Sequence, residues 1–99
     1  MKLEAKVNFE RKTKPNREIM LHTRIGEGEI KNLGWWRYDD QENLYEAASL
    51  LVKYLTGKKF QGDIVVSSIE KYKIPCELFF SELKDIYSNG KVKLEILLQ

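Results

Sequence analysis

Two stretches near the start of the chain alternate between apolar and polar residues with a period of two. In residues 2–10 the odd-numbered positions are apolar, and residues 18–25 repeat the pattern with Ile19, Leu21, Thr23 and Ile25 on one face. This period is typical of a strand with one buried and one solvent-exposed face. The segment between the two stretches contains Pro15-Asn16, a pair of residues favoured in turns. The pattern therefore predicts an antiparallel hairpin.

The stretch from Glu29 to Tyr38 is harder to assign. Gly26-Glu27-Gly28 is a second turn signal, and Gly34 interrupts the apolar residues that follow it. Two interpretations remain open for this stretch, a short third strand or an irregular segment.

Two helices are predicted from apolar residues at helical spacing. The carboxylates of Asp39 and Asp40 can accept hydrogen bonds from the unpaired N–H groups of a first helical turn. Gly57 is a residue at which such a helix typically ends. Ile74-Pro75 favours a second helix start, and Asn89-Gly90 its end. The apolar stripes are Leu44, Ala47, Ala48, Leu51 and Leu55 in the first helix, and Cys76, Phe79, Phe80, Leu83 and Tyr87 in the second.

Two further strands complete the pattern. Residues 62–72 contain the β-branched run 64–66, which suits a central strand buried on both faces, and residues 91–98 alternate again. The element order is therefore β-β-(β)-α-β-α-β. We expect one α+β domain over residues 1–99, a small two-layer sandwich with a mixed sheet of four or five strands and two helices on one face.

Composition excludes some classes of protein but does not identify one. The chain is 42% hydrophobic, which argues against disorder, and its 17 Lys and Arg against 15 Asp and Glu give a net charge of +2. Residues 1–37 hold nine Lys or Arg and five Glu, net +4, whereas residues 38–99 are net −2. All four arginines lie in the first part, and Arg grips phosphate or carboxylate bidentately. We therefore expect a binding surface in the N-terminal part.

The first candidate site is a cluster of aromatic residues beside an arginine, Trp35, Trp36, Arg37 and Tyr38. Trp, Tyr and Arg are enriched at interaction hot spots, so these residues are candidates for partner binding. Neighbouring residues of a strand point to opposite faces, so both indoles cannot easily share one core. The alternative is that both rings are core residues that cover the sheet and the start of the following helix.

The second candidate site is the basic hairpin tip, with Arg11, Lys12, Lys14, Arg17 and the more distant Arg24. Such cations can bind a nucleic-acid backbone through counterion release. The alternative is that they keep the hairpin soluble and prevent edge pairing. A third hypothesis is a small RNA-cleaving toxin that uses His22, Arg24 and a tyrosine, but the sequence shows no second acid or base for it.

The remaining chemistry-bearing residues favour a non-enzymatic role. Cys76 lies on an apolar stripe and is expected to be a small core residue, and a single cysteine favours a reducing cytoplasm. We find no metal-ligand spacing, phosphate loop or dinucleotide fingerprint, so we expect no metal and no cofactor. No apolar run is long enough for a membrane helix, so we expect no membrane partner.

The most favoured function is therefore that of a small binding or inhibitor protein that docks on a protein or ribonucleoprotein partner. In size, lysine and isoleucine content and lack of motifs, the chain resembles small accessory proteins of phages and plasmids, which often inhibit host or defence machinery by binding it. This is a similarity of type that implies no site residue. A homodimer through a terminal strand at a sheet edge is a further prediction.

Overall fold

The computed structural model describes residues 3–11, 18–37 and 41–97, and of residues 3–11, 18–20, 35, 41 and 71 it describes the backbone alone. The basic tip at 12–17 and the residues 38–40 lie outside this part. The elements are β1 (Leu3–Arg11), β2 (Glu18–Ile25), β3 (Lys31–Arg37), α1 (Gln41–Gly57), β4 (Gly62–Ile69), the 3-10 helix η1 (Glu70–Tyr72), α2 (Lys73–Ile86) and β5 (Val92–Leu97).

The strands form one mixed sheet in the order β3-β2-β1-β4-β5. β2 runs antiparallel to both β1 and β3, whereas β4 runs parallel to both β1 and β5. The N-terminal hairpin joins the C-terminal strands through β1, which pairs with β4 from Leu3↔Gly62 to Asn8↔Ser67. The predicted α+β sandwich is confirmed, and the open question about the third strand is answered in favour of a strand.

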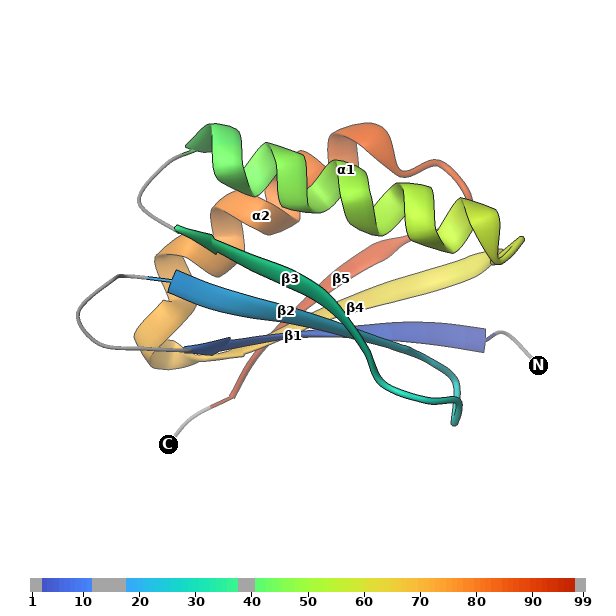
Figure 1. Cartoon of the computed structure of the whole chain (residues 1–99), viewed down its shortest axis with the longest axis horizontal. Coiled ribbons are helices and arrows are strands. Elements are labelled where there is room, and N and C mark those ends of the chain that lie inside the picture. The colour runs from blue at the N-terminus through green and yellow to red at the C-terminus, as the bar shows by residue number, and fades with distance from the viewer. Residues whose placement is uncertain (1–2, 12–17, 38–40, 98–99) are drawn as a thin grey trace.

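Both helices cover the same face of the sheet (Figure 1). The chain crosses from β3 through α1 to β4, and from β4 through α2 to β5, and both crossovers move across the sheet in the same direction. Parallel crossovers share one hand, so two crossovers in one direction put their helices on one face. α1 packs on β3 and α2, and α2 packs on β4 and β5.

The core lies between the helical layer and the sheet. Its fully buried members come from the apolar stripes of the two helices and from the strands beneath them, namely Leu21, Leu44, Ala48, Leu51, Leu55, Ile64, Val66, Cys76, Phe79 and Leu83. β4 is buried on both faces from Gly62 to Ser68, as its continuous β-branched run predicts.

α1 ends at Gly57, as predicted, and a specific backbone motif follows it. The left-handed residue is Lys59 (φ 56°), not Gly57. The N–H of Phe60 donates to the carbonyl of Leu55 at 2.9 Å, and the N–H of Lys59 to that of Thr56 at 3.0 Å. These two bonds form a Schellman motif, and the buried Phe60 and Leu55 supply its usual apolar pair.

Two other boundaries were predicted wrongly. The strand predicted to reach residue 72 ends at Ile69, because Glu70–Tyr72 form η1. α2 ends at Ile86 rather than at Asn89-Gly90. A glycine is needed at position 90 for space instead, since a Cβ there would lie 2.0 Å from the carbonyl oxygen of Gly62.

Within residues 3–11, 18–37 and 41–97, no helix has the length and apolarity to cross a bilayer.

Candidate functional site

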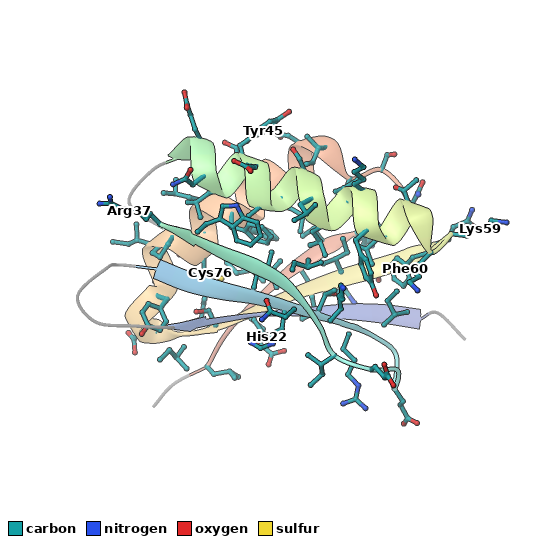
Figure 2. All side chains as sticks on the ribbon, in the orientation of Figure 1. His22, Arg37, Tyr45, Lys59, Phe60 and Cys76 are labelled. Atoms are coloured by element: carbon teal, nitrogen blue, oxygen red, sulfur yellow. The ribbon has the colours of Figure 1, made fainter. Side chains whose placement is uncertain are left out.

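An open groove of about 700 Å³ lies on the helical layer between α1 and α2. It is lined by Glu42, Tyr45, Glu46 and Ser49 of α1 and by Glu82 of α2. We call it the acidic groove. Tyr45 projects from the side of α1 that faces away from the sheet (Figure 2) and is 50% exposed.

The groove follows from the pattern of α1. Its apolar stripe is buried, and the lining residues recur at i, i+3, i+4 and i+7, so they form a second stripe beside the buried one. Since α1 packs against α2, this second stripe borders the neighbouring helix, where Glu82 completes the lining.

The lining is suited to a cationic ligand. Among the lining residues that the structure describes, three are glutamates, one is Tyr45, and none is basic. A lysine or arginine could form charge-assisted hydrogen bonds with the glutamates, and a guanidinium could also stack on Tyr45. The arrangement therefore suits recognition of a Lys- or Arg-rich segment.

The aromatic cluster predicted for partner binding is only partly a surface feature. Trp36 is half-buried and packs against the core, with its ring beside Gly34, where an added Cβ would lie 3.2 Å from it. Arg37 is exposed at the end of β3, and its carbonyl accepts a hydrogen bond from the side chain of Asn43 at 3.3 Å. Arg37 thus lies next to the first turn of α1, at the Glu42 end of the groove. The side chains of Trp35 and Tyr38 lie outside the described part.

Of the residues predicted to bind nucleic acid, the structure describes the side chain of Arg24 only. Its guanidinium donates to the carbonyl of Gly28 at 2.8 Å and to that of Glu27 at 3.2 Å, so it holds the turn between β2 and β3. The tip at 12–17 is attached to the other end of β2. At the usual rise per residue, Arg24 and the start of β2 are roughly 20 Å apart. Arg24 therefore lies at the end of β2 that leads into β3.

His22 lies on the face of the sheet away from the helices (Figure 2), between Asn8 of β1 and Asn32 of β3 in the strand register. The described tyrosines lie elsewhere, on or next to the two helices, as Tyr45, Tyr54, Tyr72 and Tyr87. The residues of the RNA-cleaving hypothesis are therefore spread over both layers of the fold.

Cys76 is fully buried on the core side of α2. Burial raises the pKa of its thiol to about 12, and the charge of Glu77 acts in the same direction, against a smaller opposing effect of the Ser68 hydrogen bond. The thiol is thus protonated near neutral pH and behaves as a core residue. In the described ranges, no group of three or more His, Cys, Asp or Glu side chains could hold a metal ion.

Sequence reasoning missed the acidic groove. The helical period marks Glu42 and Glu46 as a wet face, but it does not say which exposed residues of one helix meet those of another. Comparison with known proteins adds no assignment, since no protein-family model matches this chain and no curated protein matches its sequence.

Proposed function

We propose that this protein is a non-enzymatic binding protein that docks on a protein or ribonucleoprotein partner through the acidic groove. The observation that carries the proposal is the set of three glutamates around the half-exposed Tyr45. The segment of the partner that enters the groove is rich in lysine and arginine, as the charge of the lining requires.

Arg37 widens the proposed docking surface. It is exposed at the end of β3, its backbone carbonyl contacts Asn43 in the first turn of α1, and a guanidinium can bind a carboxylate with two hydrogen bonds. A partner segment with one acidic residue next to its basic ones would match both charges. Such a role suits an inhibitor that acts by occupying its partner in the cytoplasm, as accessory proteins of phages and plasmids do.

The first experiment measures binding of a short Arg- and Lys-rich peptide by titration calorimetry. We expect binding that weakens with salt and that is lost in the double variant Glu46→Lys/Glu82→Lys. The matched control is Glu27→Lys/Glu29→Lys, which makes the same change of net charge at the exposed β2–β3 turn. Equal binding by the two double variants would contradict the proposal.

The second experiment identifies the natural partner. The tagged protein is used for pull-down from its native host, with and without nuclease treatment, and each captured protein is tested against the same two double variants and against Tyr45→Ala. A partner that survives nuclease treatment, binds the control variant and fails to bind the groove variants supports the proposal. Capture that is lost on nuclease treatment but is unchanged in the groove variants contradicts it and favours the basic hairpin tip.

A further inference from the structure

β5 is a regular edge strand, unlike β3 at the opposite edge. It pairs with β4 from Val92 to Leu97 without a register shift. The ladder of β3 shifts in register between Leu21 and His22, and β3 contains Gly34 with φ 132°. Bulges of this kind protect an edge from pairing with other chains. In the part of the chain that the structure describes, no strand pairs with the outer side of β5.

The hydrogen bonds to β4 fix which backbone groups point outward. The N–H of Ile64 donates to the carbonyl of Lys91 at 2.8 Å, so the odd-numbered residues of β5 face β4. Successive residues of a strand alternate sides, and the N–H and C=O groups of Val92, Leu94 and Ile96 therefore point away from the sheet. An incoming strand must pair with these three residues.

The side chains select one register for an antiparallel copy of β5. If Leu94 lies opposite its own counterpart, Val92 lies opposite Ile96, and Lys93 lies opposite Glu95 on both sides of the two-fold axis. A pairing centred on Glu95 would place two glutamates opposite each other, and one centred on Lys93 would place two lysines opposite each other. Opposite charges directly across a ladder are favourable, and like charges are unfavourable. The Leu94-centred register alone matches the charges.

We propose that two copies of this chain associate through β5 in this register and form one continuous sheet. The interface is isologous, because the same strand edge serves both copies. Lys93 of each copy, whose ammonium lies 3.4 Å from Asp63 of its own chain, then faces Glu95 of the other copy.

The apolar surface beside the strand supports a second copy as the occupant. Val92, Leu94 and Ile96 pack against the core but are only partly buried. Phe80 is also partly buried against the core, and residues two positions apart lie on opposite sides of a helix, so Phe80 lies away from Glu82 and the acidic groove. A second copy would cover this surface with its own α2 and β5, and the buried apolar area adds to the backbone hydrogen bonds.

The first test is sedimentation equilibrium of the full chain over a range of concentrations. We expect a dimer mass for the wild type and a dissociation constant raised at least about tenfold by Glu95→Lys, which places lysine opposite Lys93. The control Glu29→Lys, with the same change of charge in the β2–β3 turn, should still form a dimer. An equimolar mixture of Glu95→Lys and Lys93→Glu should recover it, because the opposite charges then meet again. A wild type that stays monomeric overturns the proposal.

The second test reads the register directly and does not depend on the Lys93–Asp63 pair. Directly opposite residues of the non-hydrogen-bonded kind have Cα atoms about 4.5 Å apart, within the range of a disulfide. Under mild oxidation, a mixture of Lys93→Cys and Glu95→Cys should form a cross-linked dimer, and each variant alone should form much less. The buried Cys76 should not interfere. Cross-linking of Glu95→Cys alone to the same extent would contradict the proposed register.

Discussion

The hydroxyl of Tyr87 donates a hydrogen bond to the carbonyl oxygen of Gly62 across 2.5 Å, joining the end of α2 to the first residue of β4. Two further contacts lie beside it. The N–H of Lys91 donates to a carboxylate oxygen of Asp63 at 3.0 Å, and Gly90 lies against the same Gly62 carbonyl. This corner fixes where β4 starts against β5.

Removal of the Tyr87 hydroxyl should destabilise the fold and change its pH dependence. In Tyr87→Phe the buried Gly62 carbonyl loses its donor, and we expect the free energy of unfolding at neutral pH to fall by about 1–2 kcal/mol. Urea denaturation measures this change. Tyr45→Phe, at a half-exposed position, is the control and should change the stability by less than about 0.5 kcal/mol.

The pH dependence follows from the direction of the shift. Burial raises the pKa of Tyr87 above its usual 10.0, and the charge of Asp63 acts in the same direction. The contribution to stability is therefore complete below pH 10 and is lost as the pH rises through the pKa of the folded state. The difference in stability between the wild type and Tyr87→Phe should be constant from pH 7 to 9 and should shrink above pH 10. A difference that grows above pH 10 would refute the stated direction of the shift.

Substitution of Gly90 should be severe although Gly90 is exposed. In Gly90→Ala the new Cβ would overlap the Gly62 carbonyl, and the β4–β5 corner must move, so we expect a loss of about 3 kcal/mol. Gly57→Ala is a matched control, since no atom lies within 4 Å of a Cβ there and alanine is the better helix former. It should raise the stability by about 0.5–1 kcal/mol. Similar melting temperatures for the two variants would contradict the role of Gly90.

Lys59→Gly should stabilise the protein. Lys59 has a positive φ at the Schellman position that glycine usually occupies, and a left-handed non-glycine residue costs about 1–2 kcal/mol. Glycine loses more chain entropy on folding, so the expected net gain is about 0.5–1 kcal/mol in thermal or urea unfolding. The neighbouring control Lys58→Gly should lower the stability, because φ is not positive there and the ammonium lies 5.9 Å from the centre of the Tyr54 ring.

The thiol of Cys76 should react only when the protein opens. Its pKa of about 12, against 9.0 for an ordinary cysteine, reduces the thiolate fraction about a thousandfold near neutral pH, and burial blocks access as well. Labelling with a thiol reagent should be slow in the native protein and fast in urea. In low urea, its rate should follow the free energy of opening. Native labelling as fast as that of a free cysteine would show that Cys76 is exposed.

Most of the fold could be predicted from sequence because period and turn chemistry are local properties. The alternation in residues 18–25 gave β2 with its bounds, and the β-branched run at 64–66 predicted burial on both faces of β4. The errors lie where a contact between distant parts of the chain determines the role of a residue or the end of an element. Gly90 was predicted as the end of α2 but is required by the close approach of Gly62, and the strand predicted to reach residue 72 ends at Ile69, directly before η1.

The candidate site was less predictable for the same reason. An aromatic pair next to an arginine has the composition of a hot spot, but the partial burial of Trp36 against the core depends on the packing of α1 on β3. The acidic groove exists only through the alignment of two helices that are far apart in the sequence. Arg24 was grouped with the other N-terminal cations by charge alone. In the structure its guanidinium binds two backbone carbonyls of the β2–β3 turn, a contact that charge counting does not predict.

The central place of β1 has a consequence for the order of folding. β1 can pair with β2 as soon as the hairpin is made, but its other partner begins at Gly62, after β3 and α1 have been synthesised. Closure of such a long loop is entropically costly and typically slow. During synthesis, the second edge of β1 therefore stays open until β4 leaves the ribosome. In that interval the unpaired edge of β1 is open to pairing with other chains, and that edge is absent from the finished sheet.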